Sequence, residues 1–448
     1  MESGINVTDQ MKQDPSGVAA ATLPRPKATY GEVFADGATI ELIRGTHGGN
    51  SALLLWDGAK EIVGARVEHD GQLYEPAPIN ASLLQELILP TRCCPHGSTR
   101  EFLAETCKLI INYAVLPEKI ASLVGRVVLC SALVEAVCVA PSLMIVGPDI
   151  TRGDRLTELL RRMCWHALPL TGVTPTGFCS LAGGVRFTSL ITQANISDKL
   201  RRLLDDASYR DRKIPHRGQL LDLFGVQVIN CDSLIAGDSG PLRSIKIPMI
   251  ATEQELPPLD FDVQHRITNE FQAKLLSFRR ANLGVARKMQ FDVSKFTPAL
   301  RDRARSLAAA TPDDRDLQVE VFNLLREEDA EIRADKLIDP SAIAGEAVLV
   351  AWHGSPGGIA YVADLAVIAE QMLQRRGEKS TIEPAVFGKQ LKLLGFATER
   401  DAKGKKLQLT GAVRDRAQRL VRDFGGPEGS DGPSQAEKET WRADSGCT

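Results

Sequence analysis

The sequence predicts an α/β protein with a mostly parallel sheet, and two observations support this prediction. Between residues 141 and 250, short apolar runs alternate with amphipathic segments of helical period, the pattern of parallel strands joined by helical crossovers. A β-rich segment precedes this region and a helical, basic segment follows it. The chain has 448 residues, which is room for two or three domains.

The composition is that of an ordinary globular chain, with 43% hydrophobic and 25% charged residues. A net charge of -3 gives no whole-chain case for nucleic-acid binding, so any such case must be local. We find no secretory signal and no membrane-spanning run, and we therefore expect a cytoplasmic protein. The nine cysteines form no C-x-x-C pair, which favours reduced core residues over a disulfide or zinc framework.

The first 97 residues divide into two parts. Residues 1–35 are polar and contain prolines, so we expect a disordered arm. Residues 36–97 form a β-rich module, because strand-like runs are separated by turn signals such as Asp57-Gly58 and Asp70-Gly71. The expected strands include Thr39–Ile43, Ser51–Trp56 and Glu61–Gly64.

We assign residues 98–255 to the α/β domain and residues 256–340 to a helical region. Ser98 and Glu101 form a capping box that opens a first helix through Ile111, and a second helix runs from about 118 to 137. Helices are then expected at about 153–164, 174–181 and 197–207. The expected strands are Ser142–Val146, Ala167–Leu170, Arg186–Thr192, Gln227–Asn230 and Arg243–Pro248.

The segment after the first of these strands has the layout of a phosphate-binding loop: a buried strand, a glycine turn and an amphipathic helix. The working motif, G-x-x-x-x-G-K-[ST], needs its lysine for the phosphates and its hydroxyl for magnesium. With the first glycine at Gly147, Gly153 and Asp154 hold the lysine and hydroxyl positions, and Arg152 replaces the second glycine. In the alternative register, which ends at Gly153, Pro148 holds the first glycine position. Neither register supplies the lysine.

The charge at the start of this helix also opposes phosphate binding. Asp154 would interact favourably with the helix dipole and stabilise the helix by about 0.3–1 kcal/mol. A phosphate about 4 Å from that carboxylate meets a repulsion of about 4 kcal/mol at an effective dielectric near 20. Arg152 and Arg155 could offset part of this repulsion. An active ATPase in which Arg152 or Arg155 replaces the lysine therefore stays open as an alternative.

A P-loop ATPase also needs a carboxylate after a second central strand, where it holds magnesium. The run Thr188–Thr192 is followed by Gln193 and Asn195, with no Asp or Glu in between. Two required groups are thus missing from two separate positions. The alternative is that this sheet never bound a nucleotide and only resembles one that does.

The C-terminal segment, residues 341–425, predicts a winged helix-turn-helix. Three helices, at 342–352, 362–375 and 383–394, precede a hairpin with a basic tip, and residues 426–448 are expected to be a disordered tail. Between residues 360 and 424, 13 Lys and Arg face 8 Asp and Glu, an excess of five positive charges. In a DNA-binding winged helix-turn-helix, the third helix lies in the groove and the hairpin wing contacts phosphates. The segment therefore predicts contacts with double-stranded DNA. The candidate residues are Lys389, Gln390, Lys392, Lys403, Lys405 and Lys406. The alternative is a winged helix used for protein contacts, with a solvated tip.

The order of these parts resembles helicase-associated P-loop ATPases of bacterial mobile elements and prophages, over residues 98 to 424. The resemblance rests on the loop at 147–154, on Ile196–Leu204 and Gly218–Gly225, and on Pro241–Pro248 and Asn269–Leu276. It implies a P-loop NTPase-like fold with degenerate Walker A and Walker B motifs. It implies that Asn230 lies at the strand end where these ATPases keep a polar sensor residue. It also implies that Arg243 lies at the position where they keep an arginine. The vestigial nucleotide site then comprises Gly147, Arg152, Gly153, Arg155, Gln193, Asn230 and Arg243.

The observations predict a catalytically impaired, DNA-associated accessory protein, and the resemblance implies a role in the replication or maintenance of a mobile element. No catalytic residue, metal site or cofactor is expected, and ATP with Mg²⁺ would bind only if the variant loop functions. The two alternatives are an active ATPase with a variant loop and a structural interaction module that binds neither nucleotide nor DNA. Relatives of the fold often assemble as rings, so a homo-oligomer is a further candidate.

Overall fold

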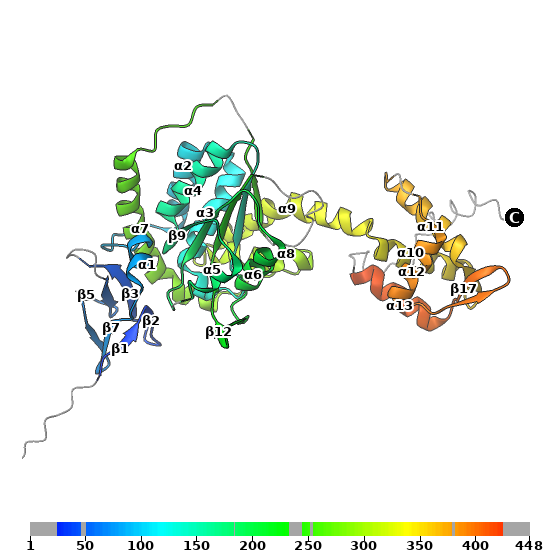
Figure 1. Cartoon of the computed structure of the whole chain (residues 1–448), viewed down its shortest axis with the longest axis horizontal. Helices are drawn as coiled ribbons and strands as arrows, with labels where there is room; N and C mark the ends of the chain where they lie inside the picture. The colour runs from blue at the N-terminus through cyan, green and yellow to red at the C-terminus, as the bar shows by residue number, and fades with distance from the viewer. Residues whose placement is uncertain are drawn as a thin grey trace, which may run out of the picture.

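The computed structural model describes residues 25–45, 51–182, 184–232, 244–250, 254–378 and 381–423. Figure 1 shows a larger body that contains the central sheet and a smaller C-terminal body, joined by the long helix α9, Arg315–Leu337. Among the described residues, no helix combines the length and apolarity that a membrane crossing requires.

Two small sheets form the N-terminal part of the larger body. One is antiparallel, in the order β2-β3-β4-β5, and the other has the order β1-β7-β6. Alternate residues of the central strands, such as Ile40 and Leu53, are fully buried between them. The strands are β1 Lys27–Thr29, β2 Gly31–Val33, β3 Thr39–Arg44, β4 Ser51–Trp56, β5 Glu61–Gly64, β6 Val67–His69 and β7 Gln72–Pro76.

Strands β1 and β2 lie inside the segment 1–35, for which the sequence predicted a disordered arm. That expectation is wrong for residues 27–33. The reason is long-range: β1 pairs in parallel with β7, and the Tyr30 hydroxyl donates to the Pro78 carbonyl at 2.8 Å. A polar local composition does not reveal a partner strand so far along the chain. Residues 1–24 of the expected arm lie outside the described residues.

Helices α1 Ala81–Glu86, α2 Thr99–Ala114 and α3 Glu118–Ala132 lead to the central sheet. The predicted capping box is present, because Ser98 Oγ accepts from the Glu101 amide and the Glu101 carboxylate accepts from the Ser98 amide. The second helix is shorter than expected. It ends at Ala132 and is followed by a separate turn of 3-10 helix.

The central sheet has five parallel strands in the order β14-β8-β13-β10-β9. The sequence predicted all five, with ends that differ by at most two residues. They are β8 Ser142–Val146, β9 Ala167–Thr171, β10 Thr188–Thr192, β13 Gln227–Cys231 and β14 Ile245–Pro248. The helices between them are α4 Ile150–Met163, α5 Pro175–Cys179 and α6 Asp198–Ala207.

Both faces of this sheet are buried, as expected for parallel strands. Along β8, Leu143 and Ile145 belong to the large core that includes α2, α3, α4 and α7, whereas Met144 packs in the core with α5 and α6. Helices α7 Phe261–Lys288, α8 Pro298–Ala309 and α9 occupy the predicted helical region.

The sequence missed one hairpin in this domain, formed by β11 Ile214–His216 and β12 Gln219–Leu221. His216 is the last residue of β11. The turn between the strands consists of Arg217 and Gly218, both with positive φ. Three-residue strands give too short an apolar pattern to be recognised from sequence.

The smaller body has its own core, which includes Leu365, Phe387, Leu391, Phe396 and Leu407. Its sheet has the order β15-β17-β16. The elements are α10 Pro340–Gly354, β15 Ile359–Tyr361, α11 Val362–Arg375, α12 Pro384–Leu393, β16 Thr398–Asp401, β17 Gly404–Gln408 and α13 Gly411–Asp423. Strand β15 and helix α13 were not predicted, and the expected disordered tail lies outside the described residues.

Candidate nucleotide and nucleic-acid sites

The carboxyl ends of the central strands meet at one edge of the sheet, where open α/β sheets bind their ligands. Strand β13 lies between β8 and β10, so Asn230 is the partner of Ile145 on one side and of Thr192 on the other. The described nucleotide-site candidates therefore gather at or beside this edge. Arg243, the remaining candidate, lies outside the described residues.

Gly147 forms the turn that leaves β8. Its φ is 149°, and a Cβ at this position would lie 2.2 Å from the Met249 carbonyl oxygen. The Met249 amide donates to the Val146 carbonyl at 2.7 Å, which holds the two chain segments together. Glycine is required here because only a residue without a side chain permits this close approach.

Helix α4 begins at Ile150, earlier than the sequence predicted, and this changes which acid lies at its N-terminus. Asp149 is the N-cap, and its Oδ1 accepts from the Arg152 amide at 3.1 Å. We expected Asp154 at the N-terminus, but that residue lies in the second turn. A helix N-terminus attracts anions through its free amides and its dipole. Here a carboxylate of the chain itself occupies that position.

The two arginines that could replace the missing lysine are both bound to protein groups. Arg152 is 5% exposed, its Nε lies 3.1 Å from Asp149 Oδ2, and its Nη2 donates to the Gln254 carbonyl at 2.6 Å. Arg155 Nη1 donates to the Pro257 carbonyl at 2.8 Å. Each guanidinium group thus fastens α4 to the segment that follows β14.

Asn230 occupies the space next to the lysine position of the motif. Its Nδ2 donates to Asp154 Oδ1 at 2.9 Å, and the residue is 8% exposed. A Cβ added to Gly153 would lie 2.8 Å from Asn230 Oδ1. A lysine at position 153 would therefore require the asparagine to move.

Gln193, at the position of the missing carboxylate, has a structural task. Its Oε1 accepts from the Val173 amide at 3.0 Å, and its Nε2 donates to the Asn195 carbonyl at 2.9 Å. The side chain links the loops that follow β9 and β10. The sequence patterns did not assign Asp149 as the N-cap of α4. The signal was available, because aspartate is among the preferred N-cap residues.

In the smaller body, α12 divides the predicted DNA contacts into two groups. Lys389 and Lys392 are exposed, on the side of the helix away from the buried Phe387 and Leu391. Gln390 is half-buried, and its Nε2 donates to Ser341 Oγ of α10 at 3.1 Å. Gln390 therefore contacts α10 and is separated from the exposed lysines.

The β16–β17 hairpin carries the other candidates. Asp401 Oδ1 accepts from the Lys403 amide at 2.8 Å, and Asp401 Oδ2 lies 3.4 Å from Lys406 Nζ. The backbone bond to Lys403 is the main reason that the pKa of the Asp401 carboxyl lies below its usual value. Lys403 and Lys405 are exposed. Lys406 is half-buried beside Asp401, so its charge is less available to a ligand than the charges of Lys403 and Lys405.

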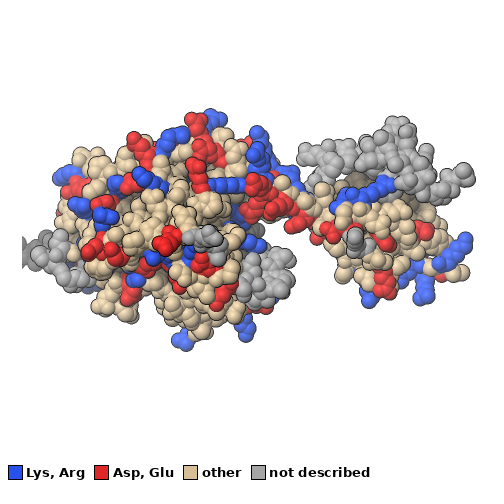
Figure 2. Space-filling view, turned by 90° about the horizontal axis from the view of Figure 1, so that it is seen from above, with Lys and Arg blue, Asp and Glu red and all other residues tan. Residues whose placement is uncertain are grey.

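One contact brings the hairpin and α12 together. A Cβ on Gly388 would lie 3.7 Å from Lys405 Cδ and 3.9 Å from Lys405 Nζ, so the lysine side chain lies against α12 at Gly388. Lys405 of the hairpin therefore lies next to the helix that carries Lys389 and Lys392. Figure 2 shows basic side chains projecting from the smaller body.

No family model matches this chain, and no curated protein matches it. Among solved structures, it is similar to the A-form apo structure of the NrS-1 C-terminal region, with 13% identity and a TM-score of 0.36, covering 82% of this chain and 96% of the other. A structure of Drosophila ORC bound to DNA aligns at 12% identity with a TM-score of 0.20, covering 80% of this chain and 96% of the other. Similarities at this level carry no functional inference, so function rests on the geometry described above.

Proposed function

We propose that this chain is a DNA-binding accessory protein whose P-loop ATPase-like sheet does not hydrolyse nucleotide, and that it serves the replication or maintenance of a mobile element. The observation that carries the DNA part is that Lys405 of the hairpin lies against α12, the helix that carries the exposed Lys389 and Lys392. The role in a mobile element rests on the family resemblance of the sequence alone.

The order of elements in the smaller body supports a winged helix-turn-helix. Helices α11 and α12 follow one another as the helix-turn-helix pair, and β16–β17 is the hairpin wing beside α12. In DNA-binding proteins of this kind, the second helix of the pair lies in the major groove. Lys389 and Lys392 on α12, with Lys403 and Lys405 on the hairpin, would then meet phosphates.

The geometry of the sheet edge supports the proposal that no nucleotide binds there. The Asp149 carboxylate already caps α4, and Asn230 abuts the position that a lysine would need. A phosphate about 4 Å from Asp149 would meet a repulsion of about 4 kcal/mol at an effective dielectric near 20. Arg152 cannot offset this without leaving its contacts with Asp149 and Gln254.

Duplex binding measured against salt tests the DNA proposal. We expect Lys389, Lys403 and Lys405, changed together to Glu, to lower affinity at least tenfold and to reduce the log–log salt slope by about 2 to 3, since each phosphate contact adds about 0.9. The matched control changes three exposed lysines of the larger body, Lys60, Lys108 and Lys288, to Glu. Equal affinities and slopes for the two triple variants would contradict DNA binding through the smaller body.

A second candidate function is protein binding by the same helix. Val386 and Leu393 are 58% and 83% exposed on the face of α12 that carries the lysines. Exposed apolar side chains of this size favour a protein contact. If Val386→Ser with Leu393→Ser abolishes self-association or partner capture while duplex binding is unchanged, the apolar pair serves proteins. Loss of duplex binding in that variant would instead place the pair in the DNA interface.

A further inference from the structure

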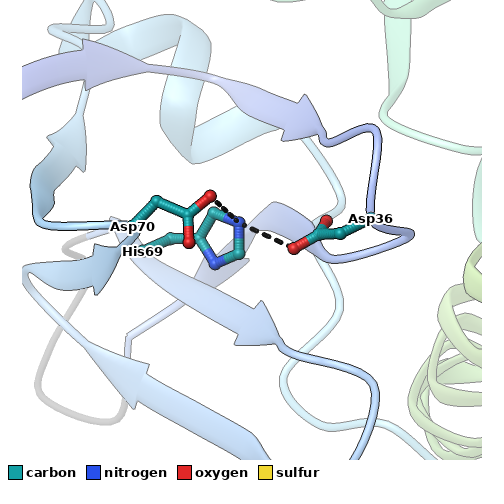
Figure 3. A group of neighbouring side chains, drawn as sticks. All are labelled: Asp36, His69 and Asp70. Carbon is teal, nitrogen blue, oxygen red and sulfur yellow. Dashed lines mark ion pairs between the residues drawn. The ribbon is translucent and has the colours of Figure 1, made fainter.

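Apart from both sites, three potential metal ligands converge in the N-terminal part of the larger body. His69 Nε2 lies 3.3 Å from Asp36 Oδ2 and 3.6 Å from Asp70 Oδ2. One ligand atom from each residue lies within 4.8 Å of the other two. Figure 3 shows the imidazole between the two carboxylates.

Two tight hairpins place these residues. Asp36 lies in the β2–β3 turn, where its Oδ1 accepts from the Ala38 amide at 2.9 Å, so its Oδ2 is left facing His69. Asp70 and Gly71 form the β6–β7 turn, with φ values of 50° and 72°. Their positive φ values are those of a two-residue hairpin turn. The carboxylates are therefore presented by ordered backbone.

The imidazole has an unmet requirement. The His69 side chain is only 9% exposed, and its Nε2 has no hydrogen-bond partner among the described residues. The Phe34 ring packs against it at a centroid distance of 4.1 Å. Both carboxylates are near, yet neither accepts a hydrogen bond from Nε2. A buried polar nitrogen without a hydrogen-bond partner requires an explanation.

The spacing matches a metal ion better than it matches hydrogen bonds. Zinc bonds nitrogen at about 2.0–2.1 Å and carboxylate oxygen at about 2.0–2.2 Å, so tetrahedral ligand atoms lie about 3.3 to 3.6 Å apart. The two measured distances from Nε2 are 3.3 and 3.6 Å. A charge-assisted hydrogen bond would be about 2.7–2.9 Å long.

We propose that Asp36, His69 and Asp70 form a divalent-metal site that takes Zn²⁺. Two carboxylates and a neutral imidazole supply two negative charges and a nitrogen donor, a set that suits zinc better than magnesium or calcium. Three protein ligands leave one tetrahedral position for water. Bound metal would link the β2–β3 hairpin to the β6–β7 hairpin, and thus the two N-terminal sheets.

Calorimetric titration of Zn²⁺ into the metal-free full chain tests this site. Asp70→Asn is the key variant, because Asp70 is exposed and asparagine also adopts positive φ without strain. We expect Asp70→Asn and His69→Gln each to weaken Zn²⁺ binding at this site at least tenfold. The matched control, Glu68→Gln, removes an exposed carboxylate from the same hairpin and leaves binding unchanged.

Cobalt provides an independent measurement, since Co²⁺ in a tetrahedral site absorbs strongly in the visible range. We expect such a spectrum for the wild-type chain and for Glu68→Gln, with its intensity reduced in Asp70→Asn. Other histidines and cysteines that bind metal would contribute equally to all of these proteins. Identical zinc isotherms and cobalt spectra for the wild type and Asp70→Asn would overturn the proposal.

Discussion

The carboxyl edge of the central sheet and the α12 surface of the smaller body are both predicted ligand sites, yet they are built in opposite ways. At the sheet edge, the charged and polar groups of Asp149, Arg152 and Asn230 are bound to one another or to nearby protein groups. In the smaller body, Lys389 on α12 and Lys405 on the hairpin beside it are exposed. A side chain that already has protein partners contributes to stability, whereas an exposed cation remains free to meet a ligand.

The largest expected effect is a difference in how glycine substitutions in the two regions change the free energy of unfolding. Gly147→Ala places a Cβ against the Met249 carbonyl at a strained φ, so we expect it to lower the free energy of unfolding by at least about 3 kcal/mol. Gly411→Ala, at the start of α13 in the smaller body, meets no neighbouring atom within 4 Å. That change is expected to stay within about 0.5 kcal/mol. Denaturant unfolding measures both, and equal losses would contradict the tight packing of the sheet edge.

Removing the N-cap is the next largest change. Asp149→Ala removes the cap of α4 and the partner of the buried Arg152, and we expect a loss of about 2 kcal/mol. Asp149→Asn keeps a capping oxygen and removes only the charge, so its loss should be smaller. The difference in free energy of unfolding between the two variants separates the capping bond from the ion pair. An unchanged stability for Asp149→Ala would show that the carboxylate is not engaged as described.

The smallest effects distinguish residues on α12 and the hairpin. Lys405→Ala should reduce the salt slope of duplex binding by about 0.9, the value for one phosphate contact. Gln390→Ala should leave duplex binding unchanged, because its amide donates to Ser341. Lys406→Ala should have a smaller effect than Lys405→Ala, since Lys406 lies beside Asp401. Fluorescence anisotropy across a salt series measures all three, and a base-specific loss in Gln390→Ala would reverse the assignment of its side chain.

Local sequence patterns accounted for the elements with strong periodicity, including the strands of the central sheet and the three principal helices of the smaller body. Features that depend on distant partners were not predictable in the same way. Strand β1 is held by β7 far along the chain, and Asp36 meets His69 only because two hairpins fold toward each other. The start of α4 was misplaced for a different reason: the resemblance to a phosphate loop favoured a loop where Asp149 begins a helix.

Calorimetric titration of ATP with Mg²⁺ into the full chain tests the central claim most directly. The claim is that the sheet edge is filled by Asp149, Arg152 and Asn230, so that it has no place for a phosphate. The account predicts no heat of binding, or a dissociation constant in the millimolar range or weaker. A micromolar dissociation constant that is lost on Arg152→Ala would contradict the account and would support the alternative in which an arginine replaces the lysine of the loop.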